Sequence, residues 1–190
     1  MLAEQTRKAN VEVWAYCLMP NHVHLILYPH DAKGLSLALG AAHKRWANFI
    51  NGRGRWRGHL FDGRFASVAM DDIHLIATIR YVALNPVRAR LAARAEDWKW
   101  SSVNAHLAGK DDGLVVVEPV LSRINDFATF IANPEDDLGF AALRAAEQTG
   151  RPIGTADFIA GLERILKRRI SRRAPGRKPV QKIADKNSMI

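Results

Sequence analysis

The sequence predicts a mixed fold of strands and helices, and three local patterns predict it. Residues 11–16 and 23–28 are rich in β-branched and aromatic side chains, which favours strands. Pro20-Asn21 between these two runs is a turn signal, so the pair predicts a β-hairpin. Residues 35–50 carry apolar side chains at helical spacing. We therefore expect a hairpin followed by a helix.

The predicted helix over 35–50 has one apolar stripe and a possible cap at Ser36. The stripe consists of Leu35, Leu39, Ala42, Trp46 and Phe49 or Ile50. A glycine-rich loop is predicted over 51–63, and a short strand over 64–70.

Asp71 and Asp72 can cap a helix over about 73–84, which Asn85-Pro86 should end or kink. Residues 96–108 predict a turn and a short helix, and further helical stretches are expected near 119–131, 138–148 and 155–170. The basic, turn-rich segment 171–190 is predicted to be disordered.

Composition limits the classes of function. The 190 residues include one cysteine, Cys17, so an internal disulfide and a four-cysteine zinc site are excluded. A reducing cytoplasmic setting is the simpler assumption. No apolar run approaches the roughly 18 residues of a membrane helix, and the polar start has no signal core, so we expect neither insertion nor secretion.

Charge is segregated along the chain, whose net charge is +9. Residues 41–94 hold ten basic and three acidic side chains, and residues 163–190 hold ten and two. Residues 95–162 hold five basic and eleven acidic ones. Since lysine and arginine displace counterions from phosphates, two basic blocks favour a nucleic-acid partner.

Two pairs of residues have the spacing of a chemical site. His22 and His24 stand two apart on the second predicted strand, so both imidazoles can reach one metal ion, or simply line a half-exposed face. Tyr81 and Asn85 stand four apart on one helix face. A tyrosine becomes a usable nucleophile when a metal polarises the phosphate that it attacks; the alternative is a core aromatic beside a helix cap.

Two basic segments are candidates for DNA binding. In the predicted loop, arginines alternate with aromatic side chains, which suits phosphates and unpaired bases, although a solvated loop would look the same. The tail carries GRKP, similar to an arm that reads the minor groove, although a nonspecific basic tail is the alternative.

Four blocks, taken in order, resemble one family. They are AYCLMPNHVHLIL (15–27), GHLFDGRFASV (58–68), RYVALNPVRARL (80–91) and WKWSS (98–102). Together they resemble the REP-associated tyrosine transposases, a branch of the single-tyrosine HUH transposases. The resemblance runs over roughly residues 11–108.

The resemblance implies an α+β fold, with a ferredoxin-like antiparallel sheet and packed helices. We expect this domain to span residues 1–108. Relatives carry a further strand and helix before the hairpin, so we expect the domain to be shortened at its N-terminus. A helical C-terminal region (109–170) and a basic tail (171–190) are expected to follow.

The resemblance also implies a mechanism. His22 and His24 would hold Mg²⁺ or Mn²⁺, with Asn85 as third ligand. Tyr81 would attack the scissile phosphate of single-stranded DNA beside a hairpin and form a 5′-phosphotyrosine. Many relatives have a histidine two residues after the tyrosine, where this chain has Ala83. We expect that change to alter the surroundings of the metal ligands rather than to abolish metal binding.

The expected partner is single-stranded, hairpin-forming DNA, and no membrane is expected as a partner. We expect the protein to act in the cytoplasm, at the nucleoid, as a monomer or a homodimer. The expected DNA-binding residues are Arg53, Arg55, Trp56, Arg57, His59, Arg64, Arg88, Arg90, Arg172, Arg173, Arg177 and Lys178. Two alternatives stay open. One is a truncated or domesticated hairpin-binding protein without catalysis, and the other is a metal hydrolase without a tyrosine intermediate.

Overall fold

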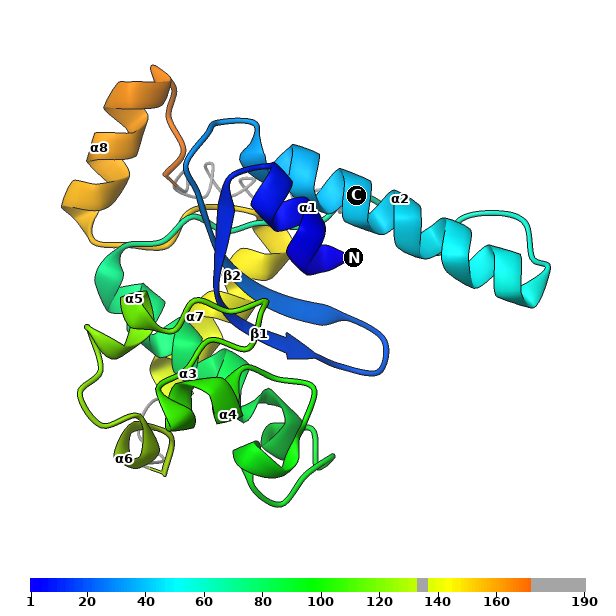
Figure 1. Ribbon diagram of the computed structural model, residues 1–190. Coiled ribbons are helices and arrows are strands. Elements are labelled where there is room, and N and C mark those ends of the chain that lie inside the picture. The colour runs from blue at the N-terminus through cyan, green and yellow to red at the C-terminus, as the bar shows by residue number, and fades with distance from the viewer. Residues whose placement is uncertain (133–136, 172–190) are drawn as a thin grey trace, which may run out of the picture.

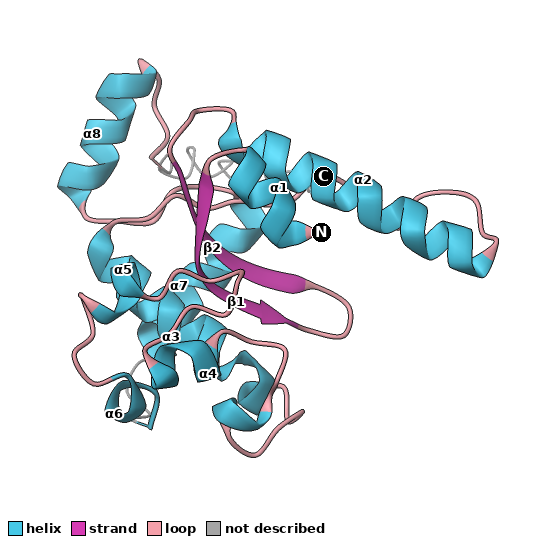
Figure 2. Cartoon of the chain, viewed as in Figure 1, coloured by secondary structure: helices cyan, strands magenta, loops and turns pink. Residues whose placement is uncertain are grey.

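A β-hairpin with helices around it forms the centre of the protein (Figures 1 and 2). The computed structural model describes residues 1–132 and 137–171. Its elements are, in chain order, α1 (Leu2–Lys8), β1 (Val11–Leu18), β2 (Val23–Pro29), α2 (Gly34–Gly54), α3 (Asp72–Arg88), the 3-10 helix η1 (Ala95–Asp97), α4 (Val103–Ala108), α5 (Glu118–Leu121), α6 (Phe127–Ala132), α7 (Asp137–Thr149) and α8 (Ala156–Leu166). The predicted α+β class is confirmed. In the described part of the chain the sheet has two strands, fewer than the four of a complete ferredoxin-like sheet.

The hairpin places its first strand between two neighbours. Alternate residues of β1 are buried, as expected for a strand with one face on the core. On one side β1 pairs with β2 in antiparallel fashion, with Cys17 opposite His24. On its other side irregular segments complete the hydrogen bonds: Leu18 N–H donates to Trp100 O over 2.8 Å. The ladder with β1 sets the register of β2, and the hydrogen bonds on the other side of β1 hold β1 itself in place.

Helix α3 packs against the sheet and begins where it was predicted to begin. The Asp71 carboxylate accepts a hydrogen bond from the His74 backbone N–H over 3.1 Å and so caps the helix. Of the two outcomes expected at Asn85-Pro86, an end or a kink of the helix, the first is wrong, because α3 runs on to Arg88. Pro86 costs the last turns one backbone hydrogen bond, but Asn85 and Pro86 are both buried, so tertiary packing outweighs that local cost.

The strand predicted over 64–70 does not form. Of these residues only Met70 makes a bridge, an isolated parallel one with Ile153. Most of the segment is exposed and finds no strand to pair with in the described part of the chain. A strand needs a partner as well as suitable residues, and the sequence pattern shows only the residues.

The C-terminal region is helical, as predicted, but its first stretch is divided. Helices α5 and α6 replace one predicted helix over 119–131, because the Asp126 carboxylate accepts the Thr129 backbone N–H over 2.9 Å and starts a new helix. Helix α8 ends at Leu166, earlier than predicted. The predicted disorder of 171–190 concerns residues that, beyond Ser171, lie outside those described. No helix of the described residues is long and apolar enough to cross a membrane.

No element is predicted from residues 1–10, but residues 2–8 form α1, which packs on the first part of α2. The second part of α2 extends beyond the body of the protein (Figure 1). Leu39 and Ala42 of the predicted apolar stripe are buried, whereas Trp46 and Phe49 are 45% and 42% exposed. The apolar stripe is therefore covered only along the first part of the helix, because nothing described covers this end of it.

Asp71 connects two helices, and its replacement should affect stability in a pH-dependent way. Its carboxylate also accepts the Thr155 backbone N–H over 2.7 Å, at the start of α8. Partial burial opposes ionisation, but the hydrogen bonds from Thr155 and His74 prevail and lower the pKa of Asp71 to about 2. Because the folded-state pKa lies below the ordinary value, this stabilisation is present above about pH 4 and is lost as the pH falls toward 2.

We expect Asp71→Ala to lower the free energy of unfolding by about 1–2 kcal/mol at pH 7, the usual cost of a lost cap. Denaturant unfolding measured from pH 7 to pH 2 should show the difference from wild type shrinking below about pH 4. Asp72→Asn, at an exposed neighbouring carboxylate, is the control. A difference that stays constant down to pH 2 would contradict the role given to Asp71.

Candidate active site

Two elements bring the predicted site residues together. His22 lies just before β2 and His24 lies within it, while Tyr81 and Asn85 lie one turn apart on α3. The Nε2 atoms of the two histidines are 3.0 Å apart. The Asn85 side-chain nitrogen is 3.0 Å from His24 Nε2, across 61 positions of sequence. His24 is therefore the central member of a three-residue cluster.

Hydrogen bonding fixes which ring nitrogen of His22 carries a proton. His22 Nδ1 lies 2.7 Å from the Asn21 side-chain oxygen, which can only accept, so Nδ1 donates, and in the neutral tautomer Nε2 carries the lone pair. Burial, with a smaller contribution from His22, lowers the pKa of His24 to about 4. At neutral pH the His24 ring is thus a neutral imidazole, the form in which histidine binds metals.

Tyr81 lies against this cluster and is largely buried. Its side chain is 6% exposed. Its ring meets the His24 ring edge-on at 5.4 Å between centroids, and it meets the Phe140 ring of α7 in the same way, also at 5.4 Å. The four-residue spacing of Tyr81 and Asn85 places both on the face of α3 that meets the histidines.

Helix α7 forms a wall of the site that sequence reasoning missed. Phe140 covers the Tyr81 ring, and the Arg88 guanidinium lies over the Phe140 ring at 4.5 Å. Glu147 Oε1 lies 3.9 Å from His24 Nδ1, on the side of the ring away from His22. Burial raises the pKa of Glu147 above its ordinary value. No spacing or motif in the sequence connects these residues with the histidines some 120 positions earlier.

The donor set fits a divalent cation. His24 Nε2 faces two nitrogens, one on His22 and one on Asn85. A ring nitrogen has one lone pair or one N–H in the ring plane, so it cannot form a good hydrogen bond with both. A cation would accept the lone pairs of both Nε2 atoms, and the Asn85 amide, turned over, would offer its oxygen. The described residues contain no group of three or more histidine, cysteine, aspartate or glutamate side chains that could hold a metal, so Asn85 would be needed as a ligand.

The predicted DNA-binding residues fall into two groups. Arg88 and Arg90 follow the site at the end of α3. The others with described positions lie on the end of α2 and in the loop between α2 and α3: Arg53, Arg55, Trp56, Arg57, His59 and Arg64. Arg172, Arg173, Arg177 and Lys178 lie outside the described residues.

Truncating Phe140 should show whether α7 supports the site. Phe140 is buried, so Phe140→Ala should lower the free energy of unfolding by about 3 kcal/mol or more in urea denaturation. Arg144→Ala, at an exposed position of the same helix, should change it by less than about 0.5 kcal/mol. Equal, small effects at both positions would show that α7 does not pack firmly on Tyr81.

One comparison with known proteins found a match. Residues 1–85 match a family model described as "Transposase IS200 like", and this range ends at Asn85 and contains Tyr81 and the three residues of the cluster. Searches of curated proteins and of solved structures found no match. The chain is therefore similar over residues 1–85 to IS200-like transposases, and this likeness supports a transposase-type function on DNA.

Proposed function

We propose that the protein is a metal-dependent single-tyrosine transposase of the REP-associated type. It would cleave and rejoin single-stranded DNA beside hairpin-forming sequences. One observation carries the proposal: His22, His24 and Asn85 converge within 3.0 Å contacts, and Tyr81 packs against His24. This convergence occurs inside the segment that matches IS200-like transposases.

The residues divide the work of phosphoryl transfer. The Tyr81 hydroxyl oxygen forms the new bond to phosphorus, and the bond from phosphorus to the 3′-oxygen breaks. The tyrosine proton is lost and the 3′-oxygen gains one, which leaves a 5′-phosphotyrosine and a free 3′-OH. A later attack by a 3′-OH on that linkage rejoins DNA and restores Tyr81, so no external energy is needed.

His22, His24 and Asn85 would hold Mg²⁺ or Mn²⁺ beside the scissile phosphate. When bound, the ion supplies Lewis-acid neutralisation of the phosphate charge. Asn21 keeps the His22 ring in the ligand tautomer, and the burial of His24 keeps its ring neutral. Arg88 and Arg90, which follow the site on the chain, are suited to the neighbouring phosphates.

The burial of Tyr81 favours a second candidate, a hairpin-binding protein without catalysis. A side chain that is 6% exposed beneath Phe140 has little access to a phosphate unless α7 moves. Such a protein would bind DNA in a salt-sensitive way, and its binding would depend neither on metal nor on Tyr81.

A covalent-adduct assay separates these candidates. The purified full chain is incubated with a single-stranded hairpin oligonucleotide, labelled on either side of the hairpin, and with Mg²⁺ or Mn²⁺. We expect an SDS-resistant adduct that carries the label 3′ of the cleavage point and is absent in EDTA. Cleaved DNA without an adduct would instead indicate a hydrolase, and binding without cleavage would indicate the non-catalytic protein.

A further inference from the structure

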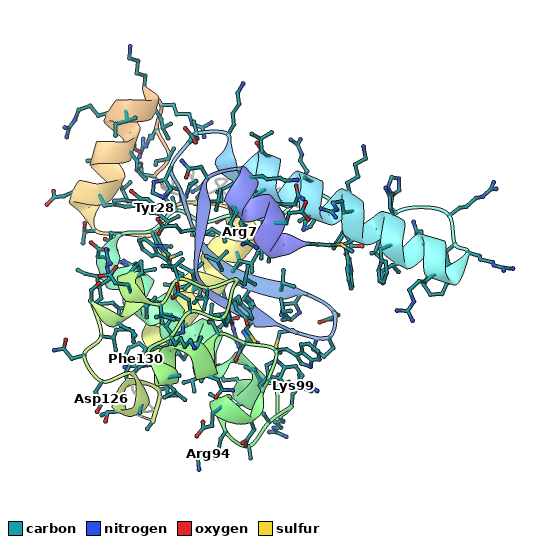
Figure 3. The ribbon with its side chains drawn as sticks, in the orientation of Figure 1. Arg7, Tyr28, Arg94, Lys99, Asp126 and Phe130 are labelled. Carbon is teal, nitrogen blue, oxygen red and sulfur yellow. The ribbon has the colours of Figure 1, made fainter. Side chains whose placement is uncertain are left out.

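The end of α2 and the loop after it form an arm with no buried side chain. We define the arm as residues 43–64, none of which is classed as buried. Figure 3 shows side chains projecting outward along this part of the helix. Besides Trp46 and Phe49, the arm has three more exposed apolar side chains: Trp56 is 65% exposed, Leu60 37% and Phe61 38%. The His43 ring is partly covered. A contiguous exposed apolar patch on a soluble protein often marks an interaction site.

Three aromatic side chains of the arm form a stripe along α2. His43, Trp46 and Phe49 follow one another at three-residue spacing, so they share a helix face. The Trp46 and Phe49 ring centroids are 5.7 Å apart. Arg53 continues the stripe, with its guanidinium 5.6 Å from the Phe49 centroid.

The loop folds back along the helix and adds two more rings. Phe61 stacks on His43, with 4.2 Å between centroids and 17° between ring planes. The Asn51 side-chain amide donates to Gly58 O over 3.0 Å and holds the loop in this path. The Trp56 indole lies over Gly54, so closely that a Cβ on Gly54 would lie 2.6 Å from the ring.

Charge decides what can cover this stripe. The arm holds six basic residues and one acidic residue, Asp62. Arg45 is already paired with Glu4 of α1, which leaves Lys44, Arg53, Arg55, Arg57 and Arg64. A second copy of the chain, docked by the same face, would bring two strongly positive surfaces together. A flexible polyanion with flat apolar groups satisfies both the cations and the rings.

We propose that the arm is a binding platform for single-stranded DNA, on which unpaired bases stack against Trp46, Phe49 and Trp56 while the arginines contact the phosphates. Base stacking on aromatic side chains is tolerant of sequence, and duplex DNA, whose bases are already stacked and paired, cannot use it. The inference rests on the proposed function, since it gives the unpaired strand a place outside the cleavage site.

Binding is tested on the Tyr81→Phe chain in EDTA, where no adduct can form, so the result does not depend on cleavage. The probe is a fluorescent oligothymidylate, compared with a blunt duplex of equal length. Trp46→Leu and Trp56→Leu, which keep apolar bulk but remove the aromatic ring, should each weaken oligothymidylate binding roughly fivefold or more. Binding of the duplex should change little.

Two glycine variants supply a matched pair. Gly54→Ala places a methyl group into the Trp56 indole, whereas Gly52→Ala meets nothing within 4 Å. Gly54→Ala should weaken oligothymidylate binding and Gly52→Ala should not. The proposal is overturned if the leucine variants bind the oligonucleotide as tightly as the parent chain. It is also overturned if analytical ultracentrifugation shows a dimer that these variants dissociate without any change in DNA affinity. A missing adduct in the wild-type chain would instead overturn the proposed function.

Discussion

Tyr81→Phe should abolish the covalent protein–DNA adduct and leave the fold intact. The substitution removes one oxygen atom and keeps the ring, so the edge-on contacts with His24 and Phe140 survive. Only the proposed nucleophile is lost, and no side chain of the cluster can form a phosphotyrosine in its place. The adduct is measured by denaturing electrophoresis with labelled hairpin DNA, and stability by urea unfolding.

The chain offers matched controls for this experiment, since it contains only three tyrosines. Tyr28 is 46% exposed and stacks on Trp14, and the Tyr16 hydroxyl donates to the Asp112 carboxylate over 2.5 Å. Tyr28→Phe and Tyr16→Phe should both retain the adduct. If the adduct persists in Tyr81→Phe and disappears in one of these controls, Tyr81 is not the nucleophile.

Features that depend on neighbours in sequence could be predicted, and features that depend on a distant partner could not. The hairpin and the Asp71 cap follow from residues within a few positions of one another, and both are present. The apolar spacing of Trp46 and Phe49 predicted their helix but not whether anything would cover their face. The segment 64–70 had the composition of a strand, but no strand among the described residues pairs with it.

The candidate site shows the same division. The spacing of His22 with His24, and of Tyr81 with Asn85, indicated which side chains share a face. The 3.0 Å contact between His24 and Asn85 joins two elements, and only the family resemblance gave a reason to expect it. Phe140 and Glu147 reach the cluster from α7, outside the segment that matches the family, so no pattern could have indicated them.

His24→Ala should have the largest effect of any change among the proposed metal ligands. His24 Nε2 is the atom that lies 3.0 Å from both His22 and Asn85, so its removal leaves two ligands that no longer share a neighbour. We expect the affinity for Mn²⁺ to fall by about 100-fold or more, since even outer partners of metal ligands are worth about 10- to 100-fold. The metal-dependent adduct should disappear with it.

Binding of Mn²⁺ is measured directly by titration calorimetry, or by the loss of the free-ion signal in electron paramagnetic resonance, so the readout does not require DNA cleavage. His30→Ala is the matched control, because His30 is an exposed histidine at the far end of the same hairpin, paired with Glu12. It should leave Mn²⁺ affinity unchanged. Asn85→Ala should weaken binding less than His24→Ala, because it removes one ligand and leaves the two Nε2 atoms together. Equal Mn²⁺ affinity in the wild type, His24→Ala and His30→Ala would show that the histidine pair packs against Tyr81 without holding a metal.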